Sequence, residues 1–285
     1  MYSLTGGNTV RMPINEATVS SYWSTYAGAI DMALTRGRVI LCYWAAKGGR
    51  PADLTAFMNM WTAVAGNYGG KSRVYFEPIN EPYGYSPGDL NDFYSDWIAA
   101  FPSVPRDRVI LDGSGYAQVP ATVGGDGRLK DCLLGYHEYA FFDSFASESA
   151  WQGHIQSDVG VYHDRTICTE FGAVMNTGTL GERRFECVLD YNVPSSDKFI
   201  LYVRAITSQF RAWGMGSVYW PGVRDNDIYA LCTRSGSGSG VSLSINNASG
   251  LVLIQHGWGS GSTSRTPSAP SDPTSSAGSS SGPSG

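Results

Sequence analysis

Two acidic residues stand at the ends of two stretches that are typical of buried β-strands. Residues 74–82 read VYFEPINEP, where an apolar run stops at Glu81 and at Pro82, a residue that removes a donor from the strand ladder. Residues 165–172 read RTICTEFG and place Glu170 near the end of a second such run. Catalytic groups usually lie at the carboxyl ends of parallel strands. The pattern therefore predicts a site with two paired carboxylates.

A pair of carboxylates can cleave a glycosidic bond. The reaction needs a proton for the departing oxygen and stabilisation of an oxocarbenium-like carbon, and two acids beside one sugar supply both. Net retention of configuration requires the two carboxyl groups to lie about 5 to 5.5 Å apart. Glu77 and Glu138 are further acids on predicted strands, and we interpret both as supporting or structural.

Five more polar or aromatic residues occur at the ends of predicted strands: Arg11, Asn80, His137, Tyr139 and Trp220. Together with NEP at residues 80–82 and TEFG at residues 169–172, they resemble glycoside hydrolase family 5, a family of retaining β-glycosidases built on (β/α)8 barrels. The matching motifs around them are VRMP, GYHEY and SVYW, and they follow the family's order between residues 8 and 220. The resemblance implies a hydrolase with neither a metal nor a cofactor.

The resemblance also implies roles for these residues. Glu81 would be the acid/base and Glu170 the nucleophile, so that Glu81 first protonates the leaving group and later takes a proton from water. The charge of Glu170 favours the protonated form of Glu81 in the first step, and this charge disappears when Glu170 is esterified. Tyr139 would orient the nucleophile, His137 would adjoin the acid/base, and Trp220 would form the floor of the reacting subsite.

Arg11 and Asn80 have roles that follow from their chemistry. A guanidinium at Arg11 would hold Glu170 ionised, because an opposite charge favours the charged form. Asn80 can donate to the 2-hydroxyl of the sugar, a hydrogen bond that strengthens in the transition state. Structural alternatives remain for three residues: Arg11 as an ordinary ion pair, His137 as a core histidine and Trp220 as core filling.

The chain departs from the family in two places. The family has a histidine near the end of strand three, whereas residues 39–44 read VILCYW, so that Tyr43 or Trp44 is expected to form this wall of the sugar pocket. The chain also begins only a few residues before Arg11, and the first strand and helix of the barrel are therefore expected to be missing.

Composition narrows the class of partner. The chain has 285 residues, 42% of them hydrophobic and 13% aromatic, which suits one barrel domain with a large core. A net charge of -5 argues against nucleic acid as a partner. A neutral polysaccharide or oligosaccharide fits better, and 8 Trp and 17 Tyr supply rings that can stack on sugars as well as fill the core.

Location and cysteine usage follow from local patterns. No apolar run approaches the roughly 20 residues of a membrane span, and Met1 does not open a signal peptide, so we expect a secreted protein whose leader is not in this sequence. Five cysteines without C-x-x-C spacing indicate neither a zinc site nor a full disulfide framework. A bridge between Cys187 and Cys232 is one candidate pairing.

Alternating strand and helix patterns predict an α/β protein with a parallel sheet. Helical spacing appears in four stretches before residue 163 and most clearly at residues 199–213, whereas residues 113–131 are too rich in Gly for a long helix. The seven predicted strands are residues 8–14, 38–44, 73–79, 109–111, 133–139, 165–170 and 216–220. We therefore predict a TIM-type (β/α)8 barrel that lacks its first β/α unit.

The C-terminal part is expected to differ from the barrel. Residues 241–254 are predicted to form a β-hairpin, which closes a barrel domain of residues 1–258. Residues 259–285 are rich in Ser, Gly and Pro and predict a flexible linker, which suggests a lost carbohydrate-binding module. The open barrel edge predicts either a homodimer or a gap filled by residues near Met1 or by the hairpin.

Three functions are compatible with these observations. The first is a retaining glycoside hydrolase that cleaves β-linked polysaccharide by double displacement, with cellulose or β-glucan as the first substrate and mannan as the second. The second is an exo-acting glycosidase on other glycosides. The third is a non-catalytic carbohydrate-binding remnant, against which the intact pair Glu81 and Glu170 argues.

Overall fold

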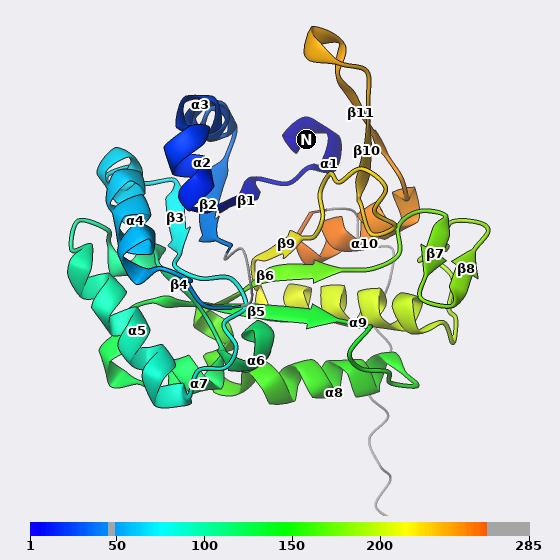
Figure 1. Ribbon diagram of the computed structural model, residues 1–285. Coiled ribbons are helices and arrows are strands. Elements are labelled where there is room, and N and C mark those ends of the chain that lie inside the picture. Colours follow the sequence, from blue (N-terminus) through cyan, green and yellow to red (C-terminus); the bar gives the residue numbers. More distant parts are fainter. Residues whose placement is uncertain (45–48, 261–285) are drawn as a thin grey trace, which may run out of the picture.

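The computed structural model describes residues 1–44 and 49–260, and seven parallel strands of these residues line a barrel (Figure 1). Three of them form one parallel sheet: β1 (Thr9–Ile14), β2 (Arg38–Tyr43) and β3 (Val74–Glu77). Four form a second: β4 (Ile110–Asp112), β5 (Leu133–Tyr139), β6 (Thr166–Gly172) and β9 (Ser217–Tyr219). A parallel bridge between Phe76 and Val109 joins the two sheets. The predicted TIM-type fold is confirmed.

Helices connect the strands in the order that the sequence predicts. The main ones are α2 (Glu16–Ser21), α3 (Trp23–Leu34), α4 (Leu54–Tyr68), α5 (Pro87–Ala100), α8 (Glu148–Val159) and α9 (Lys198–Trp213). The Asp53 side chain accepts from the Ala56 amide and thereby caps α4, as its position before an apolar helix predicts. Between β4 and β5 only short turns occur, including α6 (Ser114–Ala117) and α7 (Ala121–Gly124).

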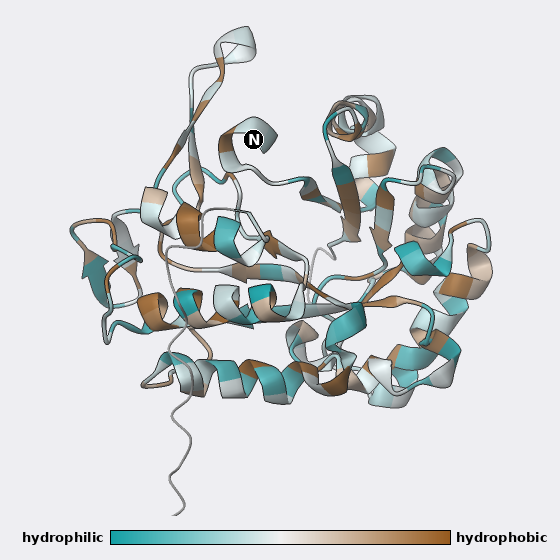
Figure 2. Ribbon diagram, turned by 180° about the vertical axis from the view of Figure 1, so that it is seen from behind, coloured by the Kyte–Doolittle hydropathy of each residue, from teal (hydrophilic) through white to brown (hydrophobic). Residues whose placement is uncertain are grey.

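Aromatic side chains fill the space between strands and helices. Trp61 of α4 and Trp97 of α5 are fully buried, with ring centroids 5.3 Å apart. On the other side of the barrel Phe171 of β6 packs edge-to-face on Phe210 of α9. In Figure 2 the strands are mostly hydrophobic, whereas the surrounding helices mix hydrophobic and hydrophilic residues. The core therefore lies in the layer between sheet and helices, as expected for this architecture.

The C-terminal region corrects one prediction. A β-hairpin is present, but it is formed by β10 (Cys232–Ser235) and β11 (Ser242–Ile245). The predicted second strand, residues 251–254, is instead part of helix α10 (Ala248–Gly257), because the Asn247 side chain accepts from the Gly250 amide and caps a helix there. A second antiparallel pair, β7 (Gly178–Leu180) with β8 (Arg183–Phe185), was not predicted.

No ladder joins β1 to β9 within the described residues, so the barrel is open where its first strand would lie. Helix α1 (Tyr2–Thr5) and the end of α10 partly occupy this gap. Gln255 donates to the Thr5 carbonyl (2.9 Å), and the Trp258 indole donates to the Ser217 carbonyl of β9 (3.1 Å). Residues near Met1 thus contribute to filling the gap, as expected. Dimerisation across it stays a prediction.

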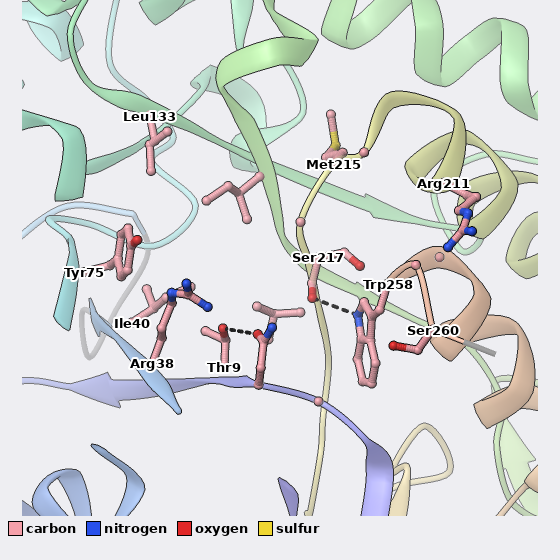
Figure 3. Close-up of a pocket in the computed structure, with 18 of the residues that line it drawn as sticks. Thr9, Arg38, Ile40, Tyr75, Leu133, Arg211, Met215, Ser217, Trp258 and Ser260 are labelled. Atoms are coloured by element: carbon pink, nitrogen blue, oxygen red, sulfur yellow. Dashed lines mark hydrogen bonds between the residues drawn. The ribbon is translucent and has the colours of Figure 1, made fainter. Parts of the chain in front are cut away.

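A cavity of about 570 Å³ remains beside this gap (Figure 3). Its lining includes the first residues of several strands, among them Arg38 of β2, Leu133 of β5 and Ser217 of β9. It therefore lies at the N-terminal mouth of the barrel, opposite the end where the predicted acids stand. The space beside the gap is therefore not filled completely by the described residues.

Two further predictions concern cysteines and the chain end. All five cysteines are free, so the candidate bridge between Cys187 and Cys232 is not formed. Within the described residues no helix has both the length and the apolar character needed to cross a membrane. Of the predicted linker 259–285, residues 261–285 lie outside the described residues.

Candidate active site

Glu81 and Glu170 meet at the C-terminal mouth of the barrel. Glu81 follows β3 and Glu170 lies near the end of β6. One carboxylate oxygen of each and one ring nitrogen of His137 all lie within 4.8 Å of one another. This separation is close to the spacing of about 5 to 5.5 Å that retaining glycosidases use.

Arg11 of β1 bridges two carboxylates, those of Glu77 and Glu170. Its buried guanidinium binds Glu77 through two hydrogen bonds (2.6 and 2.7 Å) and donates to Glu170 Oε2 (2.8 Å). It also donates to Asn80 Oδ1 (2.6 Å), so that the Asn80 amide group keeps its own donors for another partner. The predicted pairing of Arg11 with Glu170 is thus present in the structure.

Tyr139 holds the other oxygen of Glu170. Its hydroxyl donates to Glu170 Oε1 at 2.7 Å. Burial, and then the charge of Glu170, raise the pKa of Tyr139 well above its ordinary value, which keeps the hydroxyl a donor. Glu170 is therefore fixed at both oxygens, by Arg11 on one side and Tyr139 on the other.

His137 lies against Glu81. Its Nδ1 is 3.0 Å from Glu81 Oε1, and its Nε2 is 3.0 Å from Thr169 Oγ1. Burial disfavours the charged ring, but the carboxyl groups of Asp112 and Glu170 and the hydrogen bond with Glu81 outweigh it and raise the pKa of His137 to about 9. We therefore interpret His137 as an imidazolium at neutral pH.

Asp112 is a site residue that the sequence analysis missed. It ends β4, is fully buried, and accepts from the Glu81 amide at 3.0 Å. Burial and the charge of Glu77 raise the pKa of Asp112 well above its ordinary value. Burial acts in the same direction on Glu77, but the ion pair with Arg11 prevails and lowers its pKa. The sequence contained a signal for Asp112, because it lies at the end of a buried strand. The same pattern identified Glu81.

Two backbone features make this packing of acids feasible. Gly135 lies where any Cβ would stand 1.9 Å from Asp112 Oδ1, so only glycine lets β5 pass that carboxyl group. Glu81 has φ 47°, a left-handed conformation that costs a non-glycine residue about 1 to 3 kcal/mol. The Asp112 carboxylate holds the Glu81 amide in this conformation and thereby aims its side chain.

Two tryptophans form a wall beside the acids. The rings of Trp44, after β2, and Trp220, after β9, have centroids 4.9 Å apart. Tyr43 is buried and donates to Glu16 (2.8 Å), which leaves Trp44 as the candidate for this wall of the pocket. All eight predicted site residues thus lie at or next to one mouth of the barrel.

Among the described residues three groups of side chains have metal-ligand spacing; two of them overlap with the site, and the third, Glu138, Asp143 and His154, lies apart from it. Glu77, Asp112 and His137 form one such set, and Glu81, His137 and Glu170 form another. Both nitrogens of His137 already face Glu81 and Thr169, and the guanidinium of Arg11 already occupies Glu77 and Glu170. The side chains of these two groups are therefore better suited to binding and transferring protons than to binding a metal ion.

The fold and the site together define a class of protein. It is a parallel barrel that carries a pair of carboxylates at the C-terminal ends of its strands. No protein-family model and no curated protein matches the sequence. Solved structures do match over most of the chain. An endo-β-1,4-glucanase from Xanthomonas axonopodis pv. citri has a TM-score of 0.64 and 15% identity, with 90% of this chain and 88% of that chain covered.

Two further solved structures extend the comparison. The catalytic domain of the Thermobifida fusca endoglucanase Cel5A has a TM-score of 0.62 and 19% identity, with 89% and 82% covered. A β-mannanase from Streptomyces thermolilacinus has a TM-score of 0.54 and 16% identity, with 80% and 74% covered. The chain has the (β/α)8 barrel fold of glycoside hydrolase family 5 enzymes.

Proposed function

We propose that this protein is a retaining glycoside hydrolase that cleaves β-linked polysaccharide, with β-glucan as the first substrate class and mannan as the second. The observation that carries the proposal is the meeting of Glu81 and Glu170 within 4.8 Å, with Glu170 fixed by Arg11 and Tyr139. The matched structures of endoglucanases and a mannanase support this substrate class.

In the first step Glu170 attacks the anomeric carbon while Glu81 gives its proton to the departing oxygen. Arg11 and Tyr139 orient the Glu170 carboxylate, so that little reorganisation is needed before attack. The bond from carbon to the leaving oxygen breaks as the bond from carbon to a Glu170 oxygen forms. The product is a glycosyl ester and a free leaving chain.

In the second step water replaces the ester. Glu81, now a carboxylate, takes a proton from water, and the resulting hydroxide attacks the same carbon from the side that the leaving group vacated. The bond between the carbon and Glu170 breaks, and Glu170 becomes a negatively charged carboxylate again. His137, 3.0 Å from Glu81, stabilises the negative form of Glu81 at this stage.

Asn80 and Trp220 would position the reacting sugar. Because Arg11 already donates to Asn80 Oδ1, the two amide hydrogens of Asn80 remain to donate to the sugar 2-hydroxyl. Trp220 and Trp44 form a ring surface on the same side of the mouth, on which the sugar can lie. These residues define the glycone side of the proposed site.

The test is hydrolysis of carboxymethylcellulose, mannan and 4-nitrophenyl β-glycosides by the purified chain, its Glu81→Gln and Glu170→Gln variants, and Glu182→Gln as an exposed-acid control. We expect Glu170→Gln to lose at least about 10³-fold in kcat on every substrate. Glu81→Gln should lose less on nitrophenyl glycosides, because nitrophenolate departs without a proton. A wild-type chain inactive on every substrate would indicate the binding remnant instead.

A further inference from the structure

Three acids and one imidazole meet on the outer side of β5, where this strand faces helix α8 (Figure 1). Successive side chains of a strand point to opposite faces, so Glu138 points away from the site that its neighbours His137 and Tyr139 enter. Asp143 lies on the loop after β5, and His154 lies on α8. We name Glu138, Asp143 and His154 the β5–α8 cluster.

The cluster has the dimensions of a metal site. One ligand atom from each of its three residues lies within 4.8 Å of the other two. His154 Nε2 is 3.3 Å from Glu138 Oε2 and 3.6 Å from Asp143 Oδ2. The same nitrogen is 3.3 Å from Oδ2 of Asp158, which lies one turn further along α8. Nitrogen and oxygen ligands at about 2.0 to 2.2 Å from a tetrahedral Zn²⁺ are about 3.3 to 3.6 Å apart. These side chains therefore need little rearrangement to bind such an ion.

The imidazole nitrogen at the centre of the cluster has no hydrogen-bond partner among the described residues. His154 Nε2 is buried, and it forms no hydrogen bond although three carboxylates surround it. An N–H group directs its hydrogen toward one acceptor, whereas a metal ion binds several ligand atoms at once. The rings of Phe145 and Trp151 contact the imidazole, with centroids 4.9 and 6.2 Å away, and restrict its orientation.

The cluster and its neighbour Asp158 carry an excess of negative charge. Within residues 1–44 and 49–260 no lysine or arginine forms an ion pair with any of the three acids. The Glu138 side chain is fully buried, where an unpaired carboxylate is costly. The hydroxyl of Tyr136 is 2.9 Å from Glu138 and 3.1 Å from Asp158, and its one hydrogen serves one of them at a time. A bound dication would offset this excess charge.

We propose that the β5–α8 cluster binds a divalent cation of the zinc type and thereby fastens the loop after β5 to helix α8. An imidazole nitrogen beside carboxylate oxygens is a ligand set for zinc, whereas calcium and magnesium take oxygen ligands. Asp158 or a water molecule completes the coordination. The Asp143 side chain is 41% exposed, which gives the ion access from solvent.

This metal site does not depend on the proposed function. Among the described residues no hydrogen bond or ion pair joins the three ligands to Glu81 or Glu170. Zinc binding can therefore be measured whether or not the chain hydrolyses glycosides.

The experiment is a calorimetric titration of the EDTA-treated and dialysed chain with ZnCl₂ near neutral pH. The parent is Cys187→Ser, because Cys187 is an exposed thiol that can bind zinc by itself. The cluster variants are His154→Gln on α8 and Asp143→Asn on the loop. His163→Gln is the matched control, since His163 also lies 3.0 Å from an acid, Asp164. We expect one Zn²⁺ per chain, at least about tenfold weaker binding in each cluster variant, and unchanged binding in the control.

Thermal unfolding is the second measurement. A ligand that binds only the folded state raises the melting temperature, so Zn²⁺ should raise it in the parent and in His163→Gln, and much less in His154→Gln and Asp143→Asn. A parent that binds no Zn²⁺ overturns the proposal. Zinc binding that persists in both cluster variants also overturns it, because the ion then lies elsewhere, and so does tighter binding of Ca²⁺ than of Zn²⁺. Melting temperatures without zinc identify a variant that fails to fold, and the two cluster variants lie on separate elements.

Discussion

The two mouths of this barrel are built in different ways. At the C-terminal mouth charged side chains are buried and paired, with Arg11 between Glu77 and Glu170 at 2.6 and 2.8 Å. At the N-terminal mouth a cavity of about 570 Å³ is open, and Ser217 Oγ is buried without a hydrogen-bond partner. At one end several strands hold the charged groups in place, whereas the other end is open between β1 and β9 in the described residues.

The difference illustrates that the two ends of a barrel have different roles. Side chains at the carboxyl ends of strands determine chemistry, and those at the amino ends determine stability. The gap beside β1 is partly filled by a short helix and by Trp258, at the mouth opposite the acids. The open edge beside β1 is therefore compatible with an intact site, and mutations at the two ends should have separable effects.

The largest expected effect comes from removing the charge that links the acids. Arg11→Met leaves Glu77 and Glu170 buried without their cation, and we expect the free energy of unfolding to fall by about 3 to 5 kcal/mol. Arg38→Met is the matched control, because Arg38 is exposed at the opposite mouth; it should cost less than about 0.5 kcal/mol. Urea titrations of both variants measure the difference. Equal losses would show that the two mouths do not differ.

A second effect depends on pH and belongs to the same mouth. The pKa of His137 is raised in the fold to about 9 from its ordinary 6.5, so its stabilisation is complete below pH 6.5 and disappears as the pH rises through about 9. The wild type should lose roughly 3 kcal/mol of unfolding free energy over this interval. His137→Gln should flatten the profile, whereas His163→Gln, outside the site, should not. A parallel loss in His137→Gln would contradict the account.

The smallest effect is expected at the open mouth. Trp258→Phe removes the hydrogen bond to the Ser217 carbonyl and keeps most of the ring, so it should lower the free energy of unfolding by about 1 kcal/mol. Its kcat on the preferred substrate should equal that of the wild type. Trp23→Phe, the same exchange in α3, serves as a reference for lost ring area. A reduced kcat in Trp258→Phe would mean that the two mouths are coupled.

The sequence predicts the barrel well because its strands are short apolar runs, several of which end in an acid or next to Pro. Glu81 and Glu170 could be found in this way, and their neighbours Arg11 and Tyr139 followed from the motif order. Helix α10 could not be distinguished from a strand by period alone, since residues 251–254 form a short apolar run. The polar residue Asn247 before that run was the cap that decided for helix.

Tertiary proximity explains what the sequence concealed at the site. Asp112 is separated by 31 residues from Glu81, whose amide it binds, and no local pattern joins the two. The left-handed turn at residues 115–117 contains one glycine, Gly115, but no residue pattern marks Tyr116 and Ala117 as left-handed.

The central claim is that two carboxylates meeting within 4.8 Å act on one sugar, Glu170 by bonding to its anomeric carbon and Glu81 by moving the protons. Proton NMR of a cello- or manno-oligosaccharide during its first minutes of hydrolysis reports the anomer released before mutarotation. Two displacements at one carbon predict the β-anomer as the first product. Release of the α-anomer would show a single displacement by water and would contradict the assignment of Glu170 as nucleophile.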